Sequence, residues 1–146
     1  MVSEVGVGLI GFGTIGTGVV KVLRENATVI SERLGFSLRL IRVADLDTKR
    51  DRGVDLEGIR FDDDAEALIE DPDVSIVIEL IGGYETAKRL ILHAIDLRKH
   101  VVTASWINPL WSSLFIRIQK IGYRIAVDCV KRSGDGSCIH ETGRDW

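Results

Sequence analysis

The sequence contains 146 residues, which suggests one domain, long enough to bury a sizeable core. Hydrophobic residues make up 45% of the chain and charged residues 28%, as in an ordinary soluble globular protein, and the net charge of −3 gives no reason to expect binding to nucleic acid or to a membrane surface. No apolar run approaches the length of a membrane span, and the N-terminus lacks the pattern of a signal peptide. The two cysteines, Cys129 and Cys138, do not make a disulfide framework, so a reduced cytoplasmic setting is expected.

A glycine-rich turn follows the first predicted strand. Residues 5–10 form an apolar run typical of a central parallel strand, and a helical pattern follows the glycines at once. In that context the G-x-G-x-x-G pattern predicts a dinucleotide-binding site. Gly11 would permit the tight turn, Gly13 would let the backbone approach a pyrophosphate, and Gly16 would let the helix pack against the strand. The anion would lie at the helix N-terminus, where unpaired N–H groups and the helix dipole favour negative charge.

A long helix is expected after the glycines, followed by a second strand. Apolar residues recur at steps of three and four up to Gly35, where glycine readily adopts the left-handed conformation that ends a helix. The residues of this expected apolar face are Val19, Val20, Leu23, Ala27, Ile30 and Leu34. Residues 38–44 (LRLIRVA) then form the second predicted strand.

Asp45 stands directly after this second strand, where dinucleotide-binding folds place an acidic residue that binds the adenosine ribose. The alternative is that Asp45 and Asp47 are ordinary turn residues. The charged run that follows includes Lys49 and Arg50, which form either a solvated loop or a contact to the 2′-phosphate of NADP. Asp45 favours NAD and the basic residues favour NADP, so the sequence leaves the choice between NADP and NAD open.

The middle of the chain offers two groups of acidic residues. Residues 62–64 (DDD) precede a short predicted helix and are interpreted as a helix cap, not as a metal site, since no further ligands stand at suitable spacing. Glu79 lies inside the apolar run 74–81, the next predicted strand, and is expected to bond to neighbouring backbone. Gly82 and Gly83 follow at the carboxyl end of that strand, where the nicotinamide half of a dinucleotide would bind.

A further helix over residues 86–97 and a short strand over residues 101–103 complete the pattern. The inner face of this helix is expected to comprise Ala87, Leu90, Ile91, Ala94 and Leu97. His93 and His100 are isolated, so surface or helix-end positions are expected for them. Strands that alternate with helices predict an α/β fold with a doubly wound parallel sheet of the Rossmann type in a single domain.

Four blocks of the chain carry a more specific signal. They are residues 11–20 (GFGTIGTGVV), 43–47 (VADLD), 79–83 (ELIGG) and 99–104 (KHVVTA). In this order they resemble the N-terminal domain of homoserine dehydrogenase, over roughly residues 5–104. The resemblance implies NADP- or NAD-dependent interconversion of homoserine and aspartate 4-semialdehyde, a step in the biosynthesis of threonine, methionine and isoleucine.

The resemblance also assigns cofactor contacts. It implies that the glycine turn holds the pyrophosphate, that Asp45 faces the adenosine ribose, and that the two later glycines lie on the nicotinamide side with the end of the last strand. It assigns no catalytic and no metal-binding residue to this chain. The cofactor-binding residues expected are Gly11, Phe12, Gly13, Thr14, Ile15, Gly16, Asp45, Gly82, Gly83, Thr103 and Ala104.

The resemblance breaks after residue 104. Ser105 and Trp106 stand where the family has Asn-Lys, whose lysine reaches the cofactor and substrate region, and every tryptophan and cysteine of the chain lies beyond this point. Residues 114–127 again look like the family's next helix and strand. We therefore expect an NAD(P)-binding domain over residues 1–127, a divergent tail over residues 128–146 and no substrate domain, as in a truncated or frame-disrupted gene product. A natural stand-alone domain is the alternative.

Two functions follow from this organisation. The first is the NAD(P)-binding domain of a homoserine dehydrogenase that is inactive alone, with homoserine or aspartate 4-semialdehyde as substrates only in a full-length enzyme. The second is a stand-alone, non-enzymatic NAD(P)-binding regulatory module. Neither predicts nucleic acid or membrane as a partner, and both allow a homo-oligomer.

Overall fold

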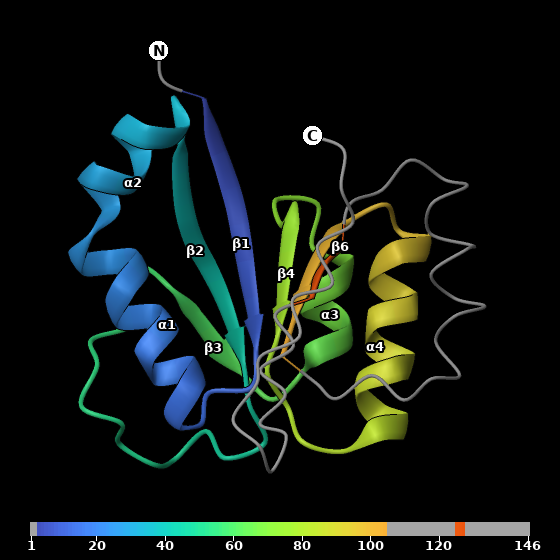
Figure 1. The fold of residues 1–146 in the computed structure, drawn as a ribbon. Helices are drawn as coiled ribbons and strands as arrows, with labels where there is room; N and C mark the ends of the chain where they lie inside the picture. Colours follow the sequence, from blue (N-terminus) through green and yellow to red (C-terminus); the bar gives the residue numbers. More distant parts are fainter. Residues whose placement is uncertain (1–2, 105–124, 128–146) are drawn as a thin grey trace, which may run out of the picture.

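The computed structural model describes residues 3–104 and the backbone of residues 125–127, and these residues form one parallel sheet flanked by helices (Figure 1). The strands are β1 (Glu4–Ile10), β2 (Ser37–Ala44), β3 (Arg60–Asp62), β4 (Ile76–Glu79), β5 (His100–Thr103) and β6 (Ile125–Val127). The helices in the described part of the chain are α1 (Thr14–Glu25), α2 (Ala27–Leu34), α3 (Ala65–Glu70) and α4 (Tyr84–Asp96).

The strand order is β3-β2-β1-β4-β5-β6, and every pair of neighbours is parallel. The chain therefore winds outward from β1 in one direction and, after β3, from β4 in the other. This is the strand order of the doubly wound dinucleotide-binding fold, in which the ligand crevice opens where the winding direction reverses. The predicted α/β fold with a doubly wound parallel sheet is confirmed.

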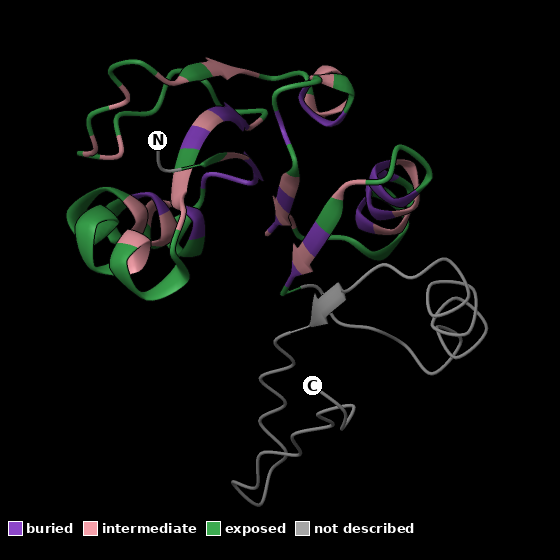
Figure 2. Ribbon diagram, turned by 90° about the horizontal axis from the view of Figure 1, so that it is seen from above, coloured by how far each residue is buried: buried purple, intermediate pink, exposed green. Residues whose placement is uncertain are grey.

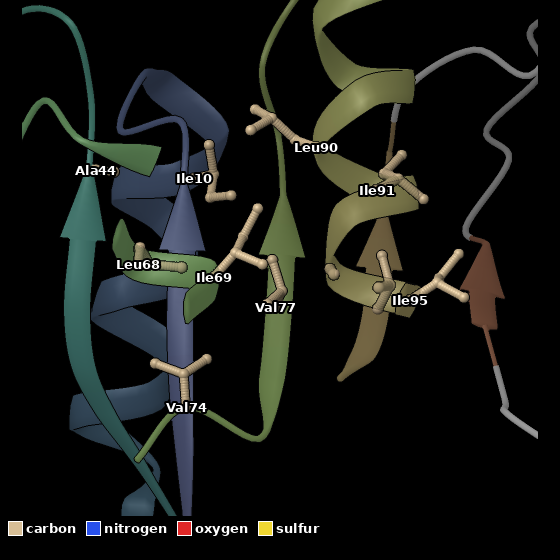
Figure 3. Close-up of a cluster of buried hydrophobic side chains, with 11 residues drawn as sticks. Ile10, Ala44, Leu68, Ile69, Val74, Val77, Leu90, Ile91 and Ile95 are labelled. Carbon is tan, nitrogen blue, oxygen red and sulfur yellow. The ribbon is translucent and has the colours of Figure 1, made fainter. Parts of the chain in front are cut away.

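Helices cover both faces of the sheet, with α1 and α2 on one side and α3 and α4 on the other (Figures 1 and 2). Under α1, the buried cluster comprises Val7, Leu9, Phe12, Val20, Leu40 and Val43. Under α3 and α4, the larger cluster drawn in Figure 3 comprises Ile10, Ala44, Leu68, Ile69, Val74, Val77, Leu90, Ile91, Ala94, Ile95 and Val101. A sheet buried on both faces explains why its strands have apolar runs rather than strict alternation.

The prediction of one long helix after the glycines is wrong. The first helix ends at Glu25, and α2 begins at Ala27. At Asn26 the backbone leaves helical geometry (φ −111°, ψ 15°), and both its amide nitrogen and its side-chain Nδ2 donate to the carbonyl of Val22. An asparagine side chain that competes for a backbone carbonyl in this way favours a helix end. Leu34, expected on the inner face, is consequently 45% exposed, whereas the predicted stop at Gly35 is confirmed by its φ of 75°.

Other differences concern single elements or residues. The sequence pattern does not predict β3, because three residues are too few to show a periodic pattern. The predicted strand over residues 74–81 is shorter, since β4 ends at Glu79. On α4 the inner face contains Ile95 where Leu97 was expected. His93 is not isolated, because its Nδ1 contacts Glu66 of α3.

The acidic run before α3 has the structural role predicted for it. Asp64 is the N-cap of α3, and its Oδ1 accepts a hydrogen bond of 2.9 Å from the Ala67 amide. Asp62 makes an ion pair of 2.8 Å with Arg42, which is 3% exposed on β2 and also donates to the Ala67 carbonyl. These contacts tie α3 to β2. Asp62 therefore serves the packing of the sheet.

No helix in the described part of the chain is long and apolar enough to cross a membrane. The strand expected within residues 114–127 is present as β6, while the helix expected before it and the tail from residue 128 onward lie outside the described residues.

Candidate cofactor-binding site

The sequence-predicted site residues come together because four strands end at the same level. The last residues of these strands are paired in one row across the sheet. They are Ala44 of β2, Ile10 of β1, Glu79 of β4 and Thr103 of β5. Every predicted site residue belongs to this row or to the segments that leave it. The parallel register thus gathers residues from four separate parts of the chain at the carboxyl edge of the sheet, where ligands bind in open α/β folds.

Two of the glycines are required by the geometry of the turn after β1. Gly11 has a φ of +97°, donates to the Ala44 carbonyl at 2.9 Å, and would place a Cβ atom 2.8 Å from the Leu80 carbonyl carbon. A Cβ atom on Gly16 would lie 2.1 Å from the Gly11 carbonyl oxygen. The first glycine therefore permits the turn beside β4, and the third permits α1 to pack on that turn.

Gly13 differs from these two, because it faces open space. It is exposed, a Cβ atom added to it would meet none of the described residues within 4 Å, and it caps α1 without a side chain. The first amides of a helix have no acceptor within the helix, and α1 has no acidic residue in its first turn. The open space above Gly13 and the positive end of the α1 dipole fit an anionic group such as a pyrophosphate.

Asp45 is placed beside the glycine turn, as expected, but most of its acceptor capacity is used within the protein. Its Oδ2 accepts from the Phe12 amide at 2.6 Å, and its Oδ1 accepts from the Asp47 amide at 2.8 Å. A third donor, Nη2 of Arg52, lies 3.2 Å from Oδ1. Since a carboxylate offers about four lone-pair sites, Asp45 retains room at Oδ2 for one further donor, such as a ribose hydroxyl.

Arg52 lies beside the candidate site, and the sequence pattern does not single it out. Its Nε donates to the Phe12 carbonyl, its Nη1 donates to the Arg50 carbonyl at 2.8 Å, and its guanidinium lies 4.8 Å from the centre of the Phe12 ring. The side chain is only 8% exposed although it belongs to a charged loop. Every nitrogen of the guanidinium is thus engaged, and the ion pair connects the loop of Arg52 to Asp45 directly after β2. The sequence signalled it only as one member of a basic run.

The other side of the turn is a shallow hollow of about 320 Å³ between α1 and the start of α4. Among the described residues it is lined by Ile15, Leu80, Ile81, Gly82, Gly83, Tyr84 and Ala104. The structure thereby brings both later glycines and Ala104 next to Ile15, which is 65% exposed. Thr103, in contrast, is 1% exposed and does not line the hollow. Phe12 is 2% exposed, so its ring packs in the core.

Glu79 lies behind this hollow and is fully buried. Its Oε1 accepts from the Ile81 amide at 2.7 Å, as expected for a strand-end residue that bonds to nearby backbone. Its Oε2 also accepts from the Thr103 hydroxyl at 2.5 Å, across to the neighbouring strand. One carboxylate therefore connects the glycine-containing loop after β4 with the end of β5.

Residues 11–115 match the family model described as the NAD-binding domain of homoserine dehydrogenase. The chain belongs to the homoserine dehydrogenase family. The match begins at the first glycine of the turn and includes every predicted cofactor-binding residue. Its cofactor is NAD(P), in agreement with the reading of the glycine turn, and the four-block resemblance in the sequence is confirmed.

Known proteins agree with this assignment. Homoserine dehydrogenase of Methylobacillus glycogenes is 46% identical over 103 residues, which are 70% of this chain and 25% of that protein. The structure of a homoserine dehydrogenase from Thiobacillus denitrificans superposes with a TM-score of 0.79 at 33% identity over 87% of this chain and 30% of the other. The S. aureus homoserine dehydrogenase has a TM-score of 0.81 at 23% identity, over 90% of this chain and 34% of the other, and supports the fold alone. The chain spans about a quarter of the length of the curated relatives it matches.

Proposed function

We propose that these 146 residues serve as the nucleotide-binding part of a homoserine dehydrogenase, an enzyme that interconverts homoserine and aspartate 4-semialdehyde. The observation that supports this is the glycine turn at the reversal of the sheet, in a chain that matches the family's NAD-binding domain. When bound, NAD(P) supplies the site that accepts or donates the hydride. The described residues bind and orient this cofactor.

Each part of the cofactor has a place in this proposal. The pyrophosphate lies over the turn from Gly11 to Gly16, at the N-terminus of α1, and receives hydrogen bonds from its first amides. The adenosine ribose lies beside Asp45, which accepts one hydroxyl at Oδ2. The nicotinamide half occupies the hollow in front of Gly82 and Gly83, whose exposed backbone allows close approach.

We infer that the chain accepts NADP as well as NAD. A lone carboxylate after the second strand would repel a 2′-phosphate, but the charge of Asp45 is balanced by Arg52 at 3.2 Å. Lys49 and Arg50 are exposed on the loop that follows, where they can attract that phosphate. Titration of the chain with NAD and with NADP tests this, and dissociation constants within about tenfold of each other are expected, a difference of about 1.4 kcal/mol. Lys49→Ala should weaken NADP binding only. A preference for NAD that exceeds a hundredfold would contradict the balance of charges.

The groups that hold homoserine are proposed to lie outside the segment matched here, which is a quarter of the relatives' length. The 146-residue chain should therefore bind NAD(P) without turning over homoserine. Calorimetry with cofactor, beside an assay for homoserine-dependent formation of NAD(P)H, separates binding from turnover. Measurable turnover would contradict the proposal that the chain is inactive alone, and absence of cofactor binding in a folded chain would contradict the proposed function.

A regulatory module, by contrast, predicts tight binding of the cofactor and a partner protein that responds to this binding. Light scattering tests for a homo-oligomer.

A further inference from the structure

We propose that Glu79 is a positioning residue for the nicotinamide half of the cofactor: its buried carboxylate fixes the loop of residues 80–83 and the end of β5 in one geometry. This inference rests on the proposed cofactor binding and adds to it a residue that does not itself contact the ligand. Glu79 has no surface exposure, so it acts only through the groups it holds.

The loop needs such a support. Gly82 and Gly83 are both exposed, and a Cβ atom added to either would meet no described residue within 4 Å, so no side chain in the described part of the chain packs where a Cβ atom would stand. Gly83 has a φ of 100°, and glycine loses more conformational freedom on ordering than any other residue. Within the described residues, hydrogen bonds at its two ends hold this loop.

The hydrogen bonds at the two ends of the loop differ in their acceptors. On the helix side, the Gly83 carbonyl accepts from the Ala87 amide at 3.3 Å as part of α4. On the strand side, Leu80 donates to the Ile10 carbonyl at 2.8 Å, and Ile81 donates to the Glu79 carboxylate at 2.7 Å. The bond from Ile81 lies next to the glycines and ends on a side chain, so it depends on the residue at position 79. Glu79 therefore sets the direction in which the chain leaves β4.

The second oxygen of Glu79 extends this control across the sheet. It accepts from the Thr103 hydroxyl at 2.5 Å, and the Ala104 amide donates to the Glu79 carbonyl at 3.3 Å. Ala104 lines the same hollow as Gly82 and Gly83. Ile81, in the loop after β4, and Ala104, directly after β5, both line the hollow and both donate a hydrogen bond to Glu79. Thr103, which the resemblance placed on the nicotinamide side, acts in this arrangement from behind the hollow.

The test compares NAD with ADP-ribose, which keeps the adenosine and the pyrophosphate but lacks nicotinamide. Glu79→Met removes both acceptor oxygens at similar length, and Glu79→Gln keeps an oxygen for the Ile81 amide while its nitrogen can donate to the Thr103 hydroxyl. In the 146-residue chain we expect Glu79→Met to weaken NAD binding about tenfold and ADP-ribose binding less than about threefold, the first change being 1.4 kcal/mol. Glu79→Gln should restore most of the affinity for NAD.

Two controls separate positioning from general loss of stability. Val101→Ala opens a cavity in β5, two residues before Thr103, at a side chain that is 1% exposed. It should lower the melting temperature and leave the ratio of NAD to ADP-ribose affinity unchanged. In Glu79→Met, hydrogen exchange of the Ile81 amide should quicken about tenfold, whereas the Leu80 amide, which donates to Ile10, should exchange as before.

The outcomes are distinct. A wild-type chain that binds neither NAD nor ADP-ribose overturns the proposed function and this inference with it. A wild-type chain that binds both, with an unchanged affinity ratio in Glu79→Met, overturns the role of Glu79 alone. Should Glu79→Met fail to fold, Thr103→Val provides the second variant, since it removes one hydroxyl at constant shape. It should lower the affinity ratio about threefold, and no change there would equally refute the proposal.

Discussion

Replacing Gly13 by aspartate separates cofactor binding from folding, because the structure gives the two effects opposite signs. Gly13 caps α1 in an extended conformation (φ −77°, ψ −157°), and within the described part of the chain nothing occupies the space where a side chain would stand. Aspartate is a preferred N-cap residue, and its charge is favourable to the helix dipole. Gly13→Asp should therefore stabilise the fold by about 0.5–1 kcal/mol and raise the melting temperature by about 2–4 °C.

The same carboxylate should oppose the cofactor. Two unit charges about 4 Å apart repel by about 4 kcal/mol at the effective dielectric constant of about 20 that suits a protein surface. Because Gly13 is exposed and salt screens the charges, half of this value is a more suitable figure, and about 2 kcal/mol corresponds to about thirtyfold in the dissociation constant. The expected result is a more stable protein that binds NAD(P) about thirtyfold more weakly.

Calorimetry at about 0.05 M and about 0.5 M salt, together with thermal melts, measures both effects. The loss of affinity should shrink at high salt. Gly13→Asn is the matched control, since asparagine caps a helix equally well without the charge, and its smaller steric loss should not depend on salt. A Gly13→Asp protein that melts higher but binds NAD(P) as tightly as the wild type would refute the placement of the pyrophosphate at α1.

Three further substitutions test individual elements. Gly18→Ala, at an exposed position inside α1 where a Cβ atom meets no described residue within 4 Å, should stabilise the fold by about 0.5–1 kcal/mol with no change in cofactor affinity, as measured by urea unfolding and calorimetry. Gly16→Ala, whose Cβ atom would lie 2.1 Å from the Gly11 carbonyl oxygen, should destabilise it by about 1–3 kcal/mol in the same unfolding assay and weaken cofactor binding as the turn shifts. Asp64→Ala removes the cap of α3 and should cost about 0.5–2 kcal/mol in thermal melts without affecting the cofactor; unchanged stability would contradict the capping role.

The parts of the fold that sequence predicts well are those with local causes. The turn from Gly11 to Gly16 combines a buried strand, fixed glycine spacing and a helix start within about a dozen residues, and each constraint leaves its own residue in the sequence. Asp45 could be placed as well, because adjacent parallel strands end level and the residue after β2 must lie near the residue after β1. The cap at Asp64 is equally local.

The parts that sequence did not predict depend on partners far apart in the chain. Arg52 bonds to the carbonyl of Phe12, 40 residues earlier, and in the sequence it is one basic residue among several. Glu79 meets the Thr103 hydroxyl 24 residues later, so its apolar surroundings predicted a buried carboxylate without naming this partner. The break at Asn26 was missed for another reason, since apolar residues continue at helical spacing on both sides of it. For Arg52 and Glu79, tertiary contacts decide between alternatives that the local pattern allows, whereas at Asn26 the local bond to the Val22 carbonyl decides.

In both halves of the candidate site, a carboxylate accepts a hydrogen bond from a backbone amide in or beside a glycine-containing turn. Beside the proposed position of the adenosine half, Asp45 accepts from the amide of Phe12, which lies between Gly11 and Gly13. Behind the proposed position of the nicotinamide half, Glu79 accepts from the amide of Ile81. Glycine backbone can approach a cofactor closely because it lacks side chains, and for the same reason it has nothing of its own to pack against the core. A carboxylate at or directly after the end of a strand fixes the position of the turn through a hydrogen bond to a backbone amide. The exposed side of the turn stays open. The cost of leaving a buried acceptor unmatched explains why the fully buried Glu79 has a second partner in the Thr103 hydroxyl. Asp45, whose side chain is 19% exposed, has Arg52 as its partner from another segment.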